Sequence, residues 1–269
     1  MYALRASRTV RQLSTHRVLR LPHHHGAFKV NRHLDSLRQQ TRLIHIGNVL
    51  IPPAIFTGLF IALWCWKCMM LVIFQNTIIY NPFMPPDARS MTIAEFAKQC
   101  GGIQWREERI KSLDGTEIAL CVADVKALQA DPTPKTVYIL YFQGNASSLP
   151  PRLPDISRVI ERVQKTNSTV NITLVGVSYR GFWTSHDRPY EKGIDKDTEA
   201  AFRWVSDIEK SRKSENGLSD EPIVILWGQS VGCGFATNLA AKTDESLNMQ
   251  IQGLVLETPF TNTRAMLIA

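Results

Sequence analysis

The chain has 269 residues, of which 44% are hydrophobic, so it is long enough to bury one full-sized core. Its net charge of +7 is unevenly spread, because nine basic residues and one acidic residue precede Ile46 and the rest is nearly neutral. Without surplus positive charge, the folded part is not expected to bind nucleic acid. The five cysteines form neither a disulfide framework nor a zinc pattern.

Residues 1–47 form a basic tail that is rich in Ser, Thr and His. Both a mitochondrial-type presequence and the cytosolic tail of a membrane anchor fit this composition. The run His23-His24-His25 is more typical of a disordered polar tract than of a weak metal site. We therefore predict no metal site, and we expect no cofactor.

Residues 48–74 are predicted to be a transmembrane helix, because Lys67 is the only charged residue in a largely apolar stretch long enough to cross a bilayer. Cys65 and Cys68 are interpreted as membrane-edge cysteines or acylation sites rather than a redox pair. The positive flank precedes the span, so the N-terminus is expected on the cytosolic (or matrix) side. A single pass through an endomembrane or the plasma membrane is predicted, with a mitochondrial membrane as the alternative.

A proline-bearing connector, residues 75–92, leads into a predicted α/β domain at 93–269. Residues 105–112 and 117–123 alternate as strands around the turn Asp114-Gly115, which indicates a hairpin. Continuous apolar runs at 137–142, 172–177, 223–227 and 251–256 are typical of buried strands, and helical spacing separates them. This alternation predicts a doubly wound, mostly parallel sheet.

The pattern Gly228-Gln229-Ser230-Val231-Gly232 lies between a buried-type strand and a predicted helix. G-x-S-x-G in this context indicates a nucleophile elbow, in which a strained turn presents the serine. The alternative is a glycine-rich turn with an incidental serine. Ligands bind such sheets at the carboxyl ends of the strands, where residues 143–147 and 178–182 should meet Ser230.

Four ordered stretches then make the chain similar to the α/β-hydrolase-fold serine hydrolases, in particular the membrane-anchored abhydrolase-domain group related to the fungal bud-emergence protein. They are residues 144–146, 179–181 with 189–193 and Asp197, 228–232, and 256–261. The resemblance implies that Ser230 is the nucleophile. It also implies that the backbone N–H groups of Val231 and Asn145 form the oxyanion hole. Gln143 stands where this family usually has a histidine.

The resemblance implies hydrolysis of carboxylic ester or thioester bonds in lipid or acylated-protein substrates, at a bilayer. In this fold an acid and a histidine follow the nucleophile. After Ser230 the chain has no histidine, and its acids are Asp244, Glu245 and Glu257. His186, in the loop after Arg180, is interpreted as a solvated histidine. We therefore expect a truncated, weakly active hydrolase, with a non-catalytic scaffold as the alternative.

Overall fold

A computed structural model describes residues 46–129, 135–145, 147–216, 221–242 and 249–260 of the chain. The basic tail up to residue 45, together with Asp244 and Glu245, lies outside the described residues. Internal contacts divide the chain into two units, residues 1–61 and 62–269.

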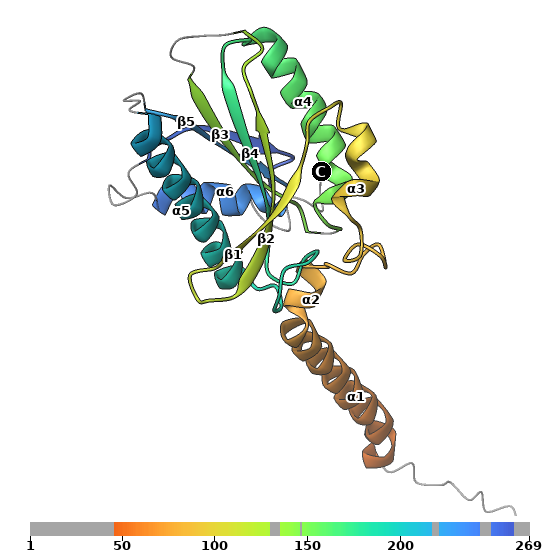
Figure 1. The fold of residues 1–269 in the computed structure, drawn as a ribbon. Helices are drawn as coiled ribbons and strands as arrows, with labels where there is room; N and C mark the ends of the chain where they lie inside the picture. Colours follow the sequence, from red (N-terminus) through yellow and green to blue (C-terminus); the bar gives the residue numbers. More distant parts are fainter. Residues whose placement is uncertain (1–45, 130–134, 146, 217–220, 243–248, 261–269) are drawn as a thin grey trace, which may run out of the picture. The chain divides into compact units, whose positions relative to one another are not determined.

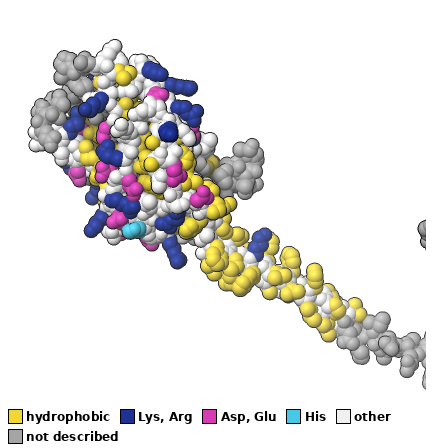
Figure 2. Space-filling view, turned by 45° about the vertical axis from the view of Figure 1, so that its right-hand side comes forward, with side chains coloured by type: hydrophobic (Ala, Val, Ile, Leu, Met, Phe, Trp, Pro, Cys, Tyr) yellow, Lys and Arg dark blue, Asp and Glu magenta, His cyan; other side chains and the backbone are white. Residues whose placement is uncertain are grey.

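The helix α1 (Ile46–Ile73) has 28 residues and closely matches the predicted span. At 1.5 Å per residue it is about 42 Å long, which exceeds the ~30 Å hydrocarbon core of a bilayer. Its apolar side chains, such as Phe56 and Trp66, are exposed (Figure 2). Among the described residues, this is the one helix with the length and composition needed to cross a membrane.

The connector contains a short helix that the sequence did not predict, α2 (Gln75–Ile79). After it, Tyr80 turns into the core and packs 6.4 Å from the Phe235 ring. Burial raises the pKa of Tyr80 to about 12, so its ring packs as a neutral group. A capping box formed by Thr92 and Glu95 starts the next helical turns, α3 (Ile93–Phe96) and η2 (Ala97–Gln99).

Six strands form one sheet in the order β1-β2-β4-β3-β5-β6 (Figure 1). The pairs β1–β2 and β2–β4 are antiparallel, and the other pairs are parallel. The predicted hairpin is confirmed, with Gly115 at φ +86° in its turn. The strands are β1 (Arg106–Lys111), β2 (Glu117–Val125), β3 (Thr136–Phe142), β4 (Asn171–Ser178), β5 (Ile223–Gln229) and β6 (Ile251–Glu257).

Helices cover both faces of the sheet, as the predicted doubly wound architecture requires (Figure 1). One apolar cluster joins α5 and α6 to strand residues such as Leu140 and Leu226, and another joins α4 to residues such as Ile139. The alternation along each strand sends neighbouring side chains to opposite clusters. These elements are η3 (Pro150–Arg152), α4 (Leu153–Thr166), α5 (Glu191–Asn216) and α6 (Val231–Lys242).

This strand order, with alternating helices, is that of the α/β-hydrolase fold. The apolar run 251–256 forms the predicted strand, but its side chains are only partly buried. Leu254, Val255 and Leu256 of β6 are 40–47% exposed. Within the described part of the chain, β6 pairs only with β5, so it forms the edge of the sheet.

A buried arginine organises the loop that follows β4. Arg180 is 1% exposed, and its guanidinium donates hydrogen bonds to the carboxylates of Asp197 and Asp114 at 2.8–3.2 Å. Its backbone N–H also donates to Asp197, at 2.8 Å. Tyr190 completes the enclosure, with its ring 5.0 Å from the guanidinium. The motifs at 179–181, 189–193 and Asp197 therefore act together as structural support.

Replacing Arg180 with alanine should leave the Asp197 carboxylate buried without its main partner. We expect Arg180→Ala to lower the free energy of unfolding by about 3–5 kcal/mol, measured by denaturant titration. Arg203→Ala is the matched control, because Arg203 forms an exposed ion pair with Glu199 at i,i+4. That control should change the free energy by less than about 0.5 kcal/mol. Equal effects of the two variants would contradict a supporting role for Arg180.

Low pH should reduce the stabilisation that Asp114 provides by pairing with Arg180. Hydrogen bonds from Arg180 hold the pKa of Asp114 well below its usual range. The ionised carboxylate therefore stabilises the fold fully above the unfolded pKa of about 3.9, and this contribution is lost as the pH falls through the folded pKa. The difference in unfolding free energy between the native chain and Asp114→Asn should be constant from about pH 5 to 7 and shrink below about pH 4. A difference independent of pH would contradict this assignment.

Candidate active site

Ser230 lies between the last residue of β5 and the first residue of α6, at a backbone φ of +52°. A positive φ in a residue with a side chain is strained and persists only where its surroundings enforce it. The Ser230 N–H donates to the Glu257 carbonyl at 2.8 Å, and the Ser230 carbonyl accepts from the Cys233 N–H at 3.0 Å. Ser230 itself is half-buried, so its hydroxyl is not sealed in the core.

The two glycines of the elbow are required by close backbone contacts. A Cβ on Gly228 would lie 2.6 Å from the Cys233 Cα, and one on Gly232 would lie 2.2 Å from the Phe142 carbonyl oxygen. Neither contact can be relieved by turning a side chain, because the opposing atoms belong to the backbone. The absent side chains allow the first turn of α6 to pack directly on the end of β3.

The loop after β3 lies beside the serine, as predicted. An ideal Cβ position on Gly144 falls 3.7 Å from the Ser230 Cβ. The Tyr179 hydroxyl donates to the Gln143 carbonyl at 3.0 Å, which ties the loop after β4 to the same place. The structure therefore brings together residues 143–145, 178–182 and the elbow. The assignment of the Val231 and Asn145 N–H groups to an oxyanion hole stays a prediction.

Gln143 contributes to this geometry through its backbone. Its side chain is 4% exposed, and neither side-chain amide atom has a hydrogen-bond partner within the described residues. An unpaired buried amide is costly, so this position is a weak point of the site. The loop nevertheless lies beside Ser230, as the Gly144 contact shows, with glutamine at position 143.

A polar network that sequence analysis missed holds the elbow from the α4 face. The Glu257 side chain forms an ion pair with Arg152 and accepts from the Gln229 amide at 3.1 Å. The Tyr141 hydroxyl donates to Gln229 at 2.7 Å and accepts from Arg152 at 3.1 Å. Burial raises the pKa of Tyr141 to about 12, which keeps its hydroxyl a donor at neutral pH. Glu257 thus supports the elbow through both its backbone and its side chain.

Among the described residues, no histidine or carboxylate forms a hydrogen bond with the Ser230 hydroxyl. His186 is the single histidine within the described ranges, and it is an exposed loop residue, as predicted. Its Nε2 lies 3.9 Å from the Glu117 carboxylate. Glu257 is engaged with Arg152, and the other two candidate acids lie outside the described residues. Across the described ranges, no hydrogen bond joins the Ser230 hydroxyl to a base.

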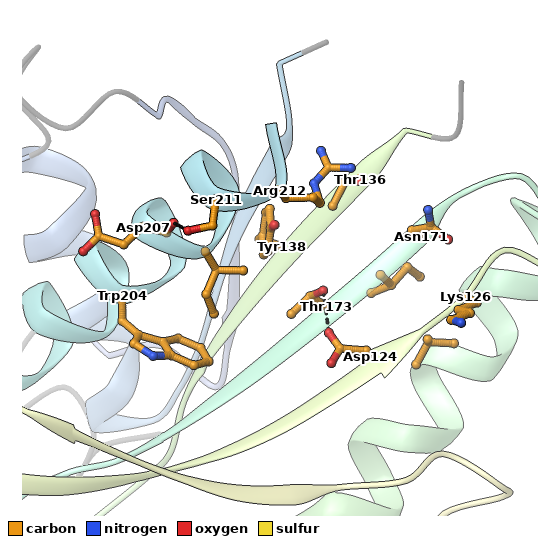
Figure 3. A pocket seen from close by; sticks show the side chains of 13 residues that line it. Asp124, Lys126, Thr136, Tyr138, Asn171, Thr173, Trp204, Asp207, Ser211 and Arg212 are labelled. Atoms are coloured by element: carbon orange, nitrogen blue, oxygen red, sulfur yellow. Dashed lines mark hydrogen bonds between the residues drawn. The ribbon is translucent and has the colours of Figure 1, made fainter. Parts of the chain in front are cut away.

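A cavity of about 620 Å³ lies at the other end of the sheet (Figure 3). It is lined by Thr136 and Asn171, which begin β3 and β4, and by Trp204 and Arg212 of α5. The seven residues of β3 separate this end from the elbow by about 20 Å. The cavity therefore does not belong to the serine site.

Comparison with known proteins places the chain among recognised relatives, although no protein-family model matches it. Protein bem46 from Schizosaccharomyces pombe is 27% identical over 196 residues, which cover 72% of this chain and 56% of bem46. The lysophosphatidylserine lipase ABHD12 of Gallus gallus is 36% identical over 126 residues, covering 47% of this chain and 29% of the lipase. The chain is a homologue of these abhydrolase-domain proteins.

The human protein ABHD12B is a further relative, 36% identical over 101 residues that cover 38% of this chain and 25% of ABHD12B. Among solved structures, an α/β hydrolase from Vibrio vulnificus aligns with a TM-score of 0.47 and 22% identity, covering 70% of this chain and 58% of that one. The chain thus spans 56% of bem46 and about a quarter of the ABHD12-type abhydrolase-domain relatives.

The close approach at the elbow can be tested with two glycines of α6. Gly232→Ala forces its new Cβ against the Phe142 carbonyl, so we expect a loss of about 1–3 kcal/mol in unfolding free energy. Gly234→Ala is the control, because a Cβ there meets nothing within 4 Å. That variant should stabilise the helix by about 0.5–1 kcal/mol. Denaturant titration distinguishes the two, and a Gly232→Ala variant as stable as the native chain would contradict the structural account.

Proposed function

We propose that the protein is a membrane-anchored serine hydrolase that cleaves carboxylic ester or thioester bonds through an acyl-enzyme on Ser230. The observation that carries this proposal is the strained φ of Ser230 at a strand–helix junction, with the Gly144 loop beside it. The homology to a lysophosphatidylserine lipase supports a lipid substrate, and an acylated protein is the alternative.

The geometry supports a two-step acyl transfer. The Ser230 oxygen attacks the substrate carbonyl, its proton passes to a base, and the alcohol or thiol leaves with a proton. Water then attacks the acyl-enzyme and releases the acid. Negative charge on the carbonyl oxygen would be stabilised by the N–H groups of Val231 and Asn145, and losing one such donor typically costs 10²–10³ in rate. The N-terminus of α6 adds favourable partial positive charge.

One described helix with the length and composition of a membrane span supports the anchor in this proposal. Helix α1 carries exposed apolar side chains along the length of Val49–Ile73, and its lone charge in that stretch is Lys67. In the proposed topology the basic N-terminal tail stays on the cytosolic side and the hydrolase domain lies across the bilayer. Endomembranes and the plasma membrane fit this topology, and a mitochondrial membrane is the alternative.

The proposed reaction needs a base that takes the proton of Ser230. An alcohol at its ordinary pKa is a poor nucleophile, and an enzyme lacking one member of its triad typically retains only about 10³–10⁴-fold acceleration over water. Because no described base contacts Ser230, we expect slow acylation by the 269-residue chain. This same observation favours the second candidate function, a non-catalytic scaffold at the membrane.

A chemical-rescue experiment tests the proposal on the full chain in detergent. A fluorophosphonate probe should label Ser230 slowly, and added imidazole should accelerate labelling by about tenfold or more, because it replaces the base. Ser230→Ala should abolish labelling with and without imidazole. Ser211→Ala is the control, since Ser211 is an exposed serine of α5 whose hydroxyl donates to the Asp207 carbonyl at 3.0 Å. It should leave labelling unchanged.

Each outcome has a defined meaning. Labelling that persists in Ser230→Ala would overturn the nucleophile assignment and favour the scaffold function. An absence of labelling in the native chain even with imidazole would do the same. Fast labelling without imidazole would support the hydrolase and contradict our expectation of weak activity.

A further inference from the structure

The connector exposes four apolar side chains within seven residues, Ile78, Ile79, Phe83 and Met84, which we call the connector patch. They are 58%, 47%, 59% and 56% exposed. Single exposed apolar residues are ordinary, whereas a group of them beside polar surface marks an interaction site. Tyr80 and Pro82, between them, are buried, so the exposure of the others does not reflect a loose segment.

The patch is attached directly to the loop that adjoins Ser230. The Asn81 N–H donates to the Asn145 carbonyl at 2.9 Å, and the Ser147 N–H donates to the Met84 carbonyl at 2.7 Å. Backbone hydrogen bonds therefore connect both ends of the segment 81–84 to the loop 143–147.

Two further contacts orient the patch. Tyr80 packs its ring against Phe235, which belongs to the helix that begins at the elbow. The Arg89 guanidinium lies 5.7 Å from the centre of the Phe83 ring and donates to the carbonyls of Trp183 and Ser185 at 3.0 and 3.1 Å. The patch is thus held by the elbow helix, by the loop after β3 and by the loop after β4.

The short stretch of chain between α1 and the patch indicates that a bilayer covers the patch. Helix α1 ends at Ile73, and the exposed apolar series continues through Phe74, Ile78 and Ile79. The ten residues from Ile73 to Phe83 reach at most about 35 Å, and the helical turn of α2 shortens this span. Because α1 is about 12 Å longer than a hydrocarbon core, a bilayer spanned by α1 would leave part of its apolar surface in a headgroup layer. The headgroup layer on the side where α1 ends would then be within reach of the patch.

We propose that the connector patch lies in the headgroup layer of the bilayer that α1 enters, and that it positions the loop 143–147 to receive acyl lipid directly from that leaflet. The second half of this proposal rests on the hydrolase function proposed above. The ester carbonyls of glycerolipids lie at the boundary between headgroups and acyl chains, which is the depth that Phe83 would occupy. The ligand class is a glycerolipid ester embedded in the membrane.

Photo-crosslinking tests the membrane contact without any need for activity. The full chain, in nanodiscs of phosphatidylcholine, carries benzoylphenylalanine in place of Phe83 or, as the control, in place of Leu128. Leu128 is 63% exposed, and its N–H donates to the Ser168 carbonyl in the loop before β4, at the other end of the sheet. We expect lipid adducts by mass spectrometry at position 83 at least tenfold above those at position 128. Equal adduct yields at positions 83 and 128 in nanodiscs would overturn the proposal. If the same experiment is repeated in native membranes, adducts to protein alone at position 83 would also overturn it.

A second measurement tests lipid delivery. The double variant Phe83→Ser, Met84→Ser keeps the backbone hydrogen bonds to the loop and removes the apolar surface. The ratio of Ser230 labelling by a long-chain, bilayer-embedded fluorophosphonate to labelling by a short, water-soluble one should fall about tenfold, whereas Leu128→Ser should leave the ratio unchanged. An unchanged ratio in the double variant would overturn delivery. Lipid adducts at position 83 without any Ser230 labelling would keep the membrane contact and remove the hydrolase function.

Discussion

The arrangement at the carboxyl end of the sheet depends on one backbone contact. The first turn of α6 packs against the end of β3, where a single added methyl group on Gly232 would lie 2.2 Å from a carbonyl oxygen. This approach sets the position of Ser230 relative to the loop 143–147. It also leaves the Ser230 N–H directed at Glu257, so that β6 completes the enclosure of the strained residue. The serine is therefore held by three strands that are distant in sequence.

Two charged groups support this end of the sheet in different ways. Arg180 is fully buried and satisfied by carboxylates from the hairpin and from α5, which fixes the loop after β4. Arg152 is partly exposed and joins η3, just before α4, to Glu257 of β6. A buried pair is strongly destabilised when one partner is removed, whereas a partly exposed pair contributes less. Of these two arginines, Arg180 is therefore expected to matter more for stability, whereas Arg152 belongs to the network that contacts the elbow.

The connector between the candidate membrane anchor and the α/β domain makes direct contacts with the candidate site. Its backbone pairs with the loop beside Ser230, and its buried Tyr80 packs on the elbow helix. The apolar residues between these attachments are then free to face a lipid surface. An enzyme that acts on membrane lipids gains from such an arrangement, because substrate need not cross water to reach the nucleophile.

The order and type of the main elements could be predicted from the sequence, since apolar runs of strand length alternate with helical spacing and glycines mark the turns. The strained turn at Ser230 could also be predicted, because G-x-S-x-G between a strand and a helix has a local steric meaning. It could not assign roles to Arg152, Tyr141 or Tyr80, whose partners lie far along the chain and leave no local pattern. The exposure of β6 is likewise not recorded in its composition, because hydrophobic composition shows what a strand can bury and not whether a neighbour covers it. Which carbonyls, carboxylates and aromatic rings meet around the serine became visible only in the folded chain, since those contacts depend on how distant segments pack.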